Sequence, residues 1–355
     1  MENHIVLSLG PEGSNRRNSE GSFLRLEDGE ILFIYSRFEG DYDDGAPSDL
    51  YMIRSADEGE TWTKPEMTLS ASRFGVSNIM SVSLLRMRNG DVGMFFIVKR
   101  PQDVDEIVLA RSSDEGKTWY RFVRCDIPGR EAYYVLNNDR AERLASGRII
   151  LPLAVHPSQP VAGVPYYFEG RGYFTALYSD DDGDTFRLSA DNVYPSFVHT
   201  KSGLQEPGVV ELRDGVLWGY ARTDQQVQYE FYSYDGGMHW SAAQPSVFTS
   251  PCSPMKIRRE PESGKLVSVW NPIPNYNGRP KYPAGWGRTP IVFSESGDNG
   301  ETWSRPVVIE GKEEYGYCYP AVFFTNDGAF LTAYCAGGPE DGICLARLTI
   351  SKIFM

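Results

Sequence analysis

One octapeptide recurs five times along the chain and limits the possible folds more than any other feature. The pattern Ser-x-Asp-x-Gly-x-(Thr/His)-aromatic begins at residues 55, 112, 179, 233 and 296, at steps of 57, 67, 54 and 63 residues. A period of this length indicates an array of one supersecondary unit. In each copy, Ser and Asp can bind turn amides, Gly accepts a positive φ, and the ring can pack between units. We therefore interpret the octapeptide as a structural hairpin turn.

A second kind of turn alternates with the octapeptides. Each is a turn containing Gly that precedes an apolar run, and there are six: Glu27–Tyr35, Arg88–Phe96, Ala145–Leu151, Arg213–Trp218, Glu262–Val269 and Thr325–Leu331. Such turns are typical of β-hairpins. With four antiparallel strands in each unit, the Gly turn joins strands one and two and the octapeptide joins strands three and four. Both turns then lie on the same face of the molecule.

The sixth unit lacks one strand. We expect its strands at Ala321–Phe324, Phe330–Tyr334 and Ile343–Ile350, and the apolar segment Ile5–Leu9 can supply the fourth. Closing a ring in this way removes exposed sheet edges. The sequence therefore predicts an all-β fold, a six-bladed β-propeller, as a single domain over residues 1–355 with very little helix.

The composition and net charge of the chain limit the classes of partner that the protein is expected to bind. The net charge of −13 argues against nucleic acid and against an anionic membrane, because both need a basic surface. The N-terminal residues lack the pattern of a signal peptide, and no run approaches the roughly 18 apolar residues of a membrane span. The five cysteines, an odd number, have no metal-ligand spacing. We expect a cytoplasmic protein with reduced thiols, no metal and no cofactor.

The face opposite the turns should gather the starts of the first and third strands and the ends of the second strands. These positions are rich in charge and aromatic hydroxyls: Arg17, Glu20, Arg37, Asp41, Asp43, Asp44, Asp49, Lys99, Arg100, Asn138, Asp139, Arg140, His156, Gln205, Glu206, Arg222, Asn271, Arg288, Tyr317 and Tyr319. Guanidinium groups bind carboxylates in a bidentate manner, and carboxylates supply acid and base. The set resembles a site for an acidic sugar.

The octapeptide resembles the Asp-box of the sialidase superfamily, and the resemblance covers essentially the whole chain. In that family three arginines bind the substrate carboxylate, an Asp is the acid/base, and a Tyr–Glu pair provides the nucleophile. The segment Gln205-Glu-Pro-Gly-Val-Val-Glu-Leu-Arg-Asp-Gly implies that Glu206 activates the nucleophile, and Tyr319-Pro-Ala-Val-Phe-Phe-Thr-Asn-Asp-Gly implies that Tyr319 is the nucleophile. A carboxylate within hydrogen-bonding reach could take the phenol proton.

The same resemblance assigns the other roles. Arg222, at the end of a strand, matches the second arginine, and Arg288 in Gly287-Arg-Thr-Pro matches the third. Arg37 resembles the basic residue that ends the second strand of the first blade. The acid/base then falls on Asp43 or Asp44, where an enclosed site can retain a proton through desolvation.

The chain departs from the family pattern at two places. The Arg-Ile-Pro start is absent, so that Arg17 in Arg16-Arg-Asn-Ser-Glu-Gly21 is the candidate first arginine, with Glu20 beside it. The Glu that supports this arginine is replaced by Cys335. The segment Asn137-Asn-Asp-Arg140, which contains Asp139 and Arg140, resembles a bacterial subgroup of sialidase-like proteins.

These features predict an exo-acting retaining glycosidase that acts on a terminal acidic sugar, sialic acid or a relative, with carbohydrate as its partner. Two alternatives remain open. One is a glycosidase or lyase on a uronic or neutral sugar, where His156 and Arg140 could act as base and charge partner. The other is a glycan-binding propeller without catalysis. Asp41–Asp44 could be a solvated loop or a weak cation site, and Tyr276, Tyr282 and Trp286, after Asn271, could stack on a sugar.

Overall fold

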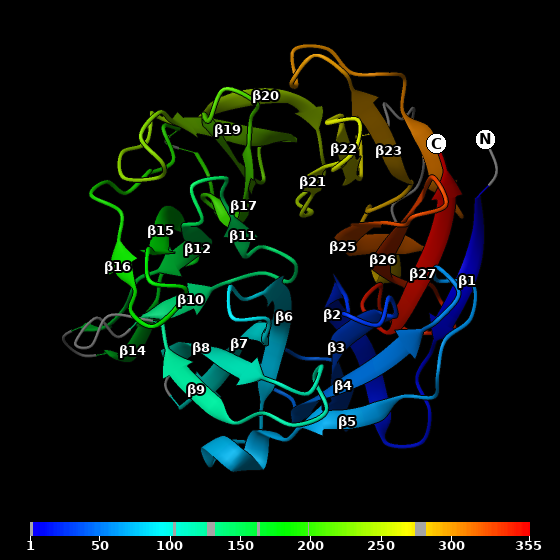
Figure 1. Ribbon diagram of the computed structural model, residues 1–355. Coiled ribbons are helices and arrows are strands. Elements are labelled where there is room, and N and C mark those ends of the chain that lie inside the picture. The colour runs from blue at the N-terminus through cyan, green and yellow to red at the C-terminus, as the bar shows by residue number, and fades with distance from the viewer. Residues whose placement is uncertain (1–2, 102–103, 126–131, 162–163, 198, 274–281) are drawn as a thin grey trace.

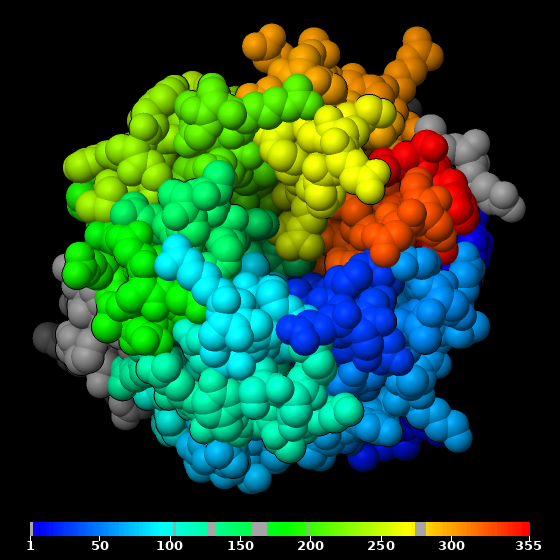
Figure 2. All heavy atoms as spheres, viewed as in Figure 1, coloured from blue at the N-terminus to red at the C-terminus, as the bar shows by residue number. Residues whose placement is uncertain are grey.

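The strands form a ring of six blades around a central axis (Figure 1). The computed structural model describes residues 3–101, 104–125, 132–161, 164–197, 199–273 and 282–355. The first strands of successive blades lie next to one another around the axis, as β2 does with β6 and β25. The same view in spheres shows a hollow near the centre of the ring (Figure 2). The predicted six-bladed β-propeller is confirmed.

Each blade is an antiparallel meander. Blade 1 contains β2 (Asn15–Arg25), β3 (Ile31–Glu39), β4 (Ser48–Ser55) and β5 (Glu66–Leu69). Blade 2 contains β6 (Ile79–Arg86), β7 (Val92–Arg100), β8 (Val104–Ser112) and β9 (Arg121–Arg124). Blade 3 contains β10 (Tyr133–Val135), β11 (Glu142–Arg143), β12 (Ile149–His156), β15 (Tyr173–Ser179) and β16 (Arg187–Leu188). Between β12 and β15 the chain forms a separate hairpin of β13 (Ser158–Val161) and β14 (Val164–Phe168).

The second half of the ring repeats this arrangement. Blade 4 contains β17 (Gln205–Glu211), β18 (Leu217–Arg222), β19 (Val227–Ser233) and β20 (Gln244–Thr249). Blade 5 contains β21 (Lys256–Arg259), β22 (Leu266–Trp270), β23 (Ile291–Ser296) and β24 (Val307–Glu310). Blade 6 contains β25 (Gly316–Phe324), β26 (Ala329–Gly337), β27 (Arg347–Phe354) and, from the other end of the sequence, β1 (Asn3–Leu9).

The ring closes where β1 pairs with β27, in a register that runs from Asn3↔Ile353 to Leu9↔Leu348 (Figure 1). The predicted closure is therefore confirmed. The predicted bounds of the third strand, Ile343–Ile350, were wrong, because β27 starts at Arg347. The residues before it form turns, and the Cys344 amide donates to Ala284 O at 2.8 Å instead of joining the sheet ladder.

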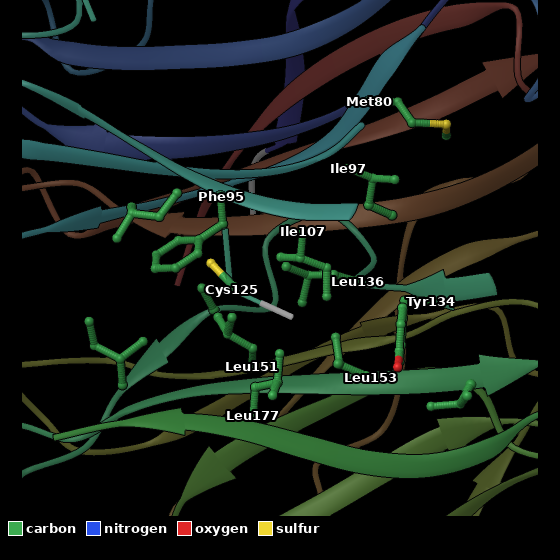
Figure 3. Packing of buried hydrophobic residues seen from close by; sticks show 14 of the residues in the cluster. Met80, Phe95, Ile97, Ile107, Cys125, Tyr134, Leu136, Leu151, Leu153 and Leu177 are labelled. Atoms are coloured by element: carbon green, nitrogen blue, oxygen red, sulfur yellow. The ribbon is translucent and has the colours of Figure 1, made fainter. Parts of the chain in front are cut away.

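Apolar strands hold neighbouring blades together. Figure 3 shows Phe95, Ile97 and Ile107 of blade 2 packed towards Leu151 and Leu153 of blade 3. The central strands are apolar on both faces because each blade is covered on both sides, as strands in a buried sheet are. Burial of each such side chain contributes roughly 1.5–3 kcal/mol.

The Asp-boxes are turns, as predicted, and their internal bonds repeat from blade to blade. In the second box the Gly116 amide donates to Ser112 Oγ at 2.8 Å. Asp114 accepts from Ser112 Oγ at 2.7 Å, from the Thr118 amide at 2.8 Å and from Thr118 Oγ1 at 2.6 Å. Gly116 has a φ of 83°, which explains why the box needs glycine there.

The fourth residue of a box also joins neighbouring blades. Glu115 accepts from the Glu27 amide of blade 1 at 3.3 Å and from Arg86 of its own blade at 2.6 and 2.9 Å. The same two kinds of contact are made in three other boxes, by Glu58, Asp182 and Asn299. We call this paired contact the blade latch. The turn face is thus a repeated set of hydrogen bonds.

Helix is scarce, as predicted. The described helices are two short 3₁₀ turns, η1 (Ala71–Phe74) and η2 (Pro283–Gly285). A search of the described residues finds no helix with the length and hydrophobicity needed to cross a membrane. All five cysteines lie in the described residues and are free thiols.

Candidate active site

A shared irregularity of the first strands positions four side chains at the axis. The register of β2, β6, β17 and β25 shifts at Ser19/Ser22, Met80/Ser83, Gln205/Gly208 and Cys318/Ala321. Within these β-bulges the φ angles are 58° for Glu20, 63° for Ser81, 46° for Glu206 and 56° for Tyr319. A bulge re-aims its side chain, and a left-handed backbone costs a non-glycine residue of order 1–3 kcal/mol. All four residues line one cavity.

This central cavity has a volume of about 300 Å³, at the lower end of the usual range for ligand pockets. Its lining is polar and charged, with a few apolar side chains: Glu20, Asp44, Met80, Ser81, Ile97, Lys99, Asp105, Tyr133, Val135, Asn137, His156, Gln205, Glu206, Arg222, Trp286, Arg288, Tyr319 and Leu345. Five of the six blades, all but blade 5, contribute through their strands, and Trp286 and Arg288 come from the loop between β22 and β23.

Tyr319 and Arg222 both form hydrogen bonds with Glu206 in the cavity. Tyr319 Oη donates to Glu206 Oε1 at 3.1 Å, and Arg222 Nη1 donates to the same oxygen at 2.6 Å. Glu206 Oε2 is buried and has no hydrogen-bond partner among the described residues. Burial raises the pKa of the Tyr319 phenol well above its usual value, and the charge of Glu206 adds to this shift. The phenol therefore holds its proton at neutral pH, beside a carboxylate oriented to accept it.

Arg288 is the second cation of the cavity. Its Nε and Nη2 donate to Cys252 O at 3.2 and 2.9 Å, and its guanidinium lies 4.9 Å from the Trp286 ring centroid. In the part of the chain that the structure describes, the buried Nη1 has no hydrogen-bond partner. Asn271 does not line the cavity. Its Nδ2 donates to Arg288 O and Pro290 O, both at 3.0 Å, so that it holds the loop of Arg288 in place.

Arg17 lies outside the cavity lining, and each of its three guanidinium nitrogens donates to a protein atom. Nε donates to Ser19 Oγ at 2.9 Å and Nη2 to Glu20 Oε1 at 2.8 Å. Nη1 donates to Asp44 Oδ1 at 2.6 Å and to Tyr42 O at 2.9 Å. The side chain is fully buried, at 0% exposure. Two acidic side chains therefore hold the candidate first arginine before any ligand binds.

The pKa values of the two acids that hold Arg17 are shifted in opposite directions. Burial raises the pKa of Glu20 to about 7 even though Arg17 acts to lower it. Burial also acts to raise the pKa of Asp44, but the charges of Arg17, Lys99 and Arg222 outweigh it and hold the pKa below its usual value. The expectation that desolvation keeps this Asp protonated is wrong for the ligand-free protein, because Asp44 is ion-paired and half exposed.

Three further candidates lie outside the cavity lining. Arg37 is partly exposed, donates to Glu39 at 3.1 Å and lies over the Tyr51 ring. Asp139 is buried and accepts from Ser22 Oγ at 2.9 Å and from Arg258 at 3.3 Å, which joins blades 1, 3 and 5. Arg140, also buried, donates to Met255 O at 2.6 Å.

The remaining candidates divide between the cavity and the surface. His156 lines the cavity, and burial lowers its pKa, so that the imidazole is neutral at pH 7. Asp43 is exposed and does not line the central cavity. Trp286 lines it, Tyr282 precedes η2, and Tyr276 lies outside the described residues.

Sequence reasoning missed Ser81, Asp105, Tyr133 and Asn137 in the lining. A usable signal existed for Ser81. In four blades the bulge residue lies nine positions before the positive-φ glycine of the next turn, as Glu20 precedes Gly29 and Ser81 precedes Gly90. The same spacing links Glu206 to Gly215 and Tyr319 to Gly328. Counting back from the turns would have found all four.

Comparisons with known proteins agree with this architecture. The family model described as "BNR repeat-like domain" matches residues 34–332. The chain belongs to this family. Among curated proteins, an anhydrosialidase of Macrobdella decora is 28% identical over 142 residues, which are 39% of this chain and only 17% of that protein.

Solved structures show the same fold over nearly the whole chain. A protein of unknown function from Dyadobacter fermentans has a TM-score of 0.71 and 20% identity, with 99% of each chain covered. A Hadza microbial sialidase has a TM-score of 0.74 and 15% identity, covering 98% of this chain and 68% of that one. Trypanosoma rangeli sialidase in complex with 2,3-difluorosialic acid has a TM-score of 0.72 and 13% identity, covering 99% of this chain and 59% of that one. The predicted sialidase/BNR-repeat superfamily is confirmed.

Proposed function

We propose that the protein is a retaining exo-glycosidase that removes a terminal acidic sugar, with Tyr319 as the nucleophile. The observation that supports this most is the 3.1 Å hydrogen bond from Tyr319 Oη to Glu206 Oε1 at the end of a small cavity. A neutral phenol is a weak nucleophile, and a carboxylate that takes its proton removes this barrier. A phenol also approaches an anionic sugar without the repulsion that a carboxylate nucleophile would meet.

The steps follow from the positions of the side chains. Asp44 gives a proton to the glycosidic oxygen while Tyr319 Oη attacks the anomeric carbon and Glu206 receives the phenol proton. The leaving group departs as an alcohol, and a tyrosyl–sugar bond forms. Water then breaks this bond, with Asp44 as base and Glu206 returning the proton to the phenol. To act as the acid, Asp44 must carry a proton, and its pKa is lowered in the ligand-free protein. Turnover should therefore increase as the pH falls and more of Asp44 is protonated.

Two arginines support an acidic substrate. Arg288 Nη1 is buried and makes no hydrogen bond within the described ranges, and Arg222 is held beside Glu206. Both can pair with a substrate carboxylate, as guanidinium groups do. Sialic acid and related acids therefore remain the first candidates for the sugar.

One observation favours the second candidate, a uronic or neutral sugar. Each guanidinium nitrogen of Arg17 already donates to the protein, with Ser19, Tyr42, Asp44 and Glu20 as acceptors, and the side chain does not line the cavity. A cavity with two available arginines contacts a substrate carboxylate less extensively than one with three, so it is compatible with a sugar whose carboxylate is placed differently or absent.

Covalent trapping tests the proposal directly. The protein is incubated with 2,3-difluorosialic acid and with the corresponding 2-deoxy-2-fluoro uronosyl and hexosyl fluorides, and then digested for mass spectrometry. We expect one of these sugars to be attached to the peptide that contains Tyr319, and no adduct in Tyr319→Phe. An adduct on a carboxylate, or turnover that survives Tyr319→Phe, would overturn the nucleophile assignment.

A further inference from the structure

The first strand of blade 3 is interrupted at the axis. β10 ends at Val135 and β11 begins at Glu142, and between them the chain runs to the centre of the ring (Figure 1). Residues 137–140, with the sequence Asn-Asn-Asp-Arg, are each only 1–2% exposed although all four are polar. We call them the axial segment. Polar groups at this depth need hydrogen-bond partners, so their contacts indicate what the segment does.

The axial segment bonds to the inner edges of three other blades. β2, β6 and β25 are each the terminal strand of their described sheet, so their inner backbone groups face the axis. The Asp139 amide donates to Val82 O of blade 2 at 2.9 Å, and Asn138 Nδ2 donates to Gly21 O of blade 1 at 3.0 Å. In blade 6, Asn138 Nδ2 donates to Tyr319 O at 3.3 Å. Buried edge groups need partners, and here a loop supplies them.

These contacts lie within the bulges that carry the cavity side chains. In blade 1 the bonded carbonyl is that of Gly21, next to Glu20. In blade 2 it is that of Val82, next to Ser81. In blade 6 it belongs to Tyr319, the proposed nucleophile. A left-handed backbone persists only where its surroundings hold it, so these bonds help to fix three of the four strained residues.

Asp139 holds the same bulges at a second point. Its Oδ2 accepts from the Val322 amide at 3.2 Å, three residues beyond Tyr319, and its Oδ1 accepts from Ser22 Oγ at 2.9 Å. Arg258 Nη2, 3.3 Å from Oδ1, pairs with the buried carboxylate. The bulge that carries the nucleophile is therefore held at residues 319 and 322 by two consecutive residues of blade 3.

Asn138 itself lacks one bond. Its Oδ1 is buried and has no hydrogen-bond partner within the described residues, whereas its Nδ2 serves two carbonyls. An unpaired buried acceptor destabilises a fold. Departures of this kind from full pairing are typical of functional sites. The side chain is therefore better explained by the two bulges that its amide holds than by stability.

The hydrogen bond between Tyr319 and Glu206 joins two separate supports. Tyr319 is held by the axial segment, and Glu206 is held by Arg222 of its own blade. A shift of the Tyr319 backbone would therefore not carry Glu206 with it, and the 3.1 Å separation of Oη and Oε1 would change. Misplacement of a reacting group by about 1 Å can lower a rate roughly 100-fold.

Resting on the function proposed above, we propose that Asn138 is a positioning residue for the nucleophile. Its bond to Tyr319 O keeps the phenol within hydrogen-bonding distance of Glu206. Asn138 lies outside the cavity lining, so it acts on the phenol through the backbone and not through contact with the sugar.

Asn138→Ala removes both bonds to the bulges and gives the test. The matched control is Asn18→Ala. Asn18 is also buried, at 3% exposure, and its Nδ2 donates to two backbone carbonyls, Leu9 O at 3.3 Å and Gly10 O at 3.2 Å, neither of which belongs to a bulge. Asn138→Ser, with one donor on a shorter side chain, takes the place of Asn138→Ala if that variant does not fold, and the same outcomes apply to it.

Three measurements are made on each protein. Labelling with [ζ-¹³C]tyrosine gives NMR signals for the phenols, and the Tyr319 signal is assigned by its absence from Tyr319→Phe. This signal reports the surroundings and hydrogen bonding of the phenol without any substrate. Steady-state kinetics on the glycoside that wild type cleaves gives kcat and KM, and urea denaturation gives the free energy of unfolding.

We expect the Tyr319 signal to move in Asn138→Ala and to keep its wild-type position in Asn18→Ala. In Asn138→Ala, kcat should fall by roughly 10–100-fold with KM within about twofold of wild type. Asn18→Ala should keep the wild-type kcat per folded molecule even where it loses as much stability, which separates positioning from a structural role.

A Tyr319 signal that stays in place in Asn138→Ala, or that moves equally in the control, would overturn the assignment. So would a wild-type kcat in Asn138→Ala. If wild type cleaves no glycoside, the proposed function fails, and the NMR measurement still decides whether Asn138 positions the phenol.

Discussion

Each face of the propeller is formed by equivalent positions of the same repeat. On the turn face these positions make the same contacts in each Asp-box, whereas on the opposite face their residues vary. On the turn face the Asp-boxes repeat one set of contacts, and the bond from the Gly amide to Ser Oγ is 2.8 or 2.9 Å in all five. On the opposite face the equivalent bulge positions of four blades hold three kinds of side chain: Glu20 and Glu206, Ser81, and Tyr319. The repeated positions stabilise the ring, and we propose that the bulge positions provide its chemistry. Substitutions should separate these two roles.

The largest effect is expected at the cavity. Tyr319→Phe keeps the ring but removes the oxygen that we propose as nucleophile, so kcat should fall by about 10³-fold or more. Steady-state kinetics on the glycoside that wild type cleaves measures this. The unfolding free energy should change by only about 1 kcal/mol, because one hydrogen bond is lost. A variant that keeps most of its turnover would remove Tyr319 from the chemistry.

The second-largest effect is expected on the turn face. Asp114→Ala removes the acceptor of three hydrogen bonds in the second Asp-box. We expect the free energy of unfolding to fall by about 1–3 kcal/mol, measured by urea denaturation, and kcat per folded molecule to remain at the wild-type value. Asp114→Asn, which keeps one acceptor oxygen, should lose less. A loss of kcat without a loss of stability would contradict the division between the two faces.

A third prediction concerns how the cavity responds to pH. Burial raises the pKa of Glu20 from 4.5 to about 7, so the folded protein holds this proton more tightly than the unfolded chain. The stabilisation is complete below pH 4.5 and is lost as the pH rises through 7. Between pH 5 and 8, wild type should therefore lose on the order of 1–2 kcal/mol more than Glu20→Gln. Thermal unfolding across this range measures the difference, and parallel curves would mean that Glu20 ionises normally.

The smallest effect is expected at a blade latch. Glu115→Gln weakens the pair with Arg86, which is partly exposed. Such pairs contribute about 0.2–1 kcal/mol and are screened by salt. A double-mutant cycle with Arg86→Gln, at low and high salt, measures the coupling. Coupling that does not change with salt would show that the latch acts through packing instead of charge.

The sequence predicted the ring better than it predicted the site. Asp-box spacing and apolar strands are local patterns, and they determine the blades because five of the six blades have an Asp-box and all six have apolar strands. The pairing of Glu206 with Tyr319 followed from a family resemblance, and the structure places their oxygens 3.1 Å apart. Their catalytic roles remain predictions.

Contacts between distant segments explain what the sequence could not predict. Nothing near Arg17 indicates that Asp44, 27 residues away, occupies its Nη1. Nor does local sequence indicate that Asp139 bonds to Ser22, 117 residues away. Both depend on which side chains the ring brings to its axis. The bulges were missed for another reason, since a one-residue insertion hardly changes the hydrophobic pattern of a strand.

The pairing of β1 with β27 has a kinetic consequence. Blades 6 and 1 meet where the ring closes, and Asn18 of blade 1 donates through its amide to Ala346 O of blade 6. Tyr319 comes from one of these blades, and Glu20 and Asp44 come from the other. An intermediate with every blade formed but the ring still open would contain all of these groups and would be inactive. Enzymatic activity should therefore be the last property gained during refolding and the first lost when the chain ends separate.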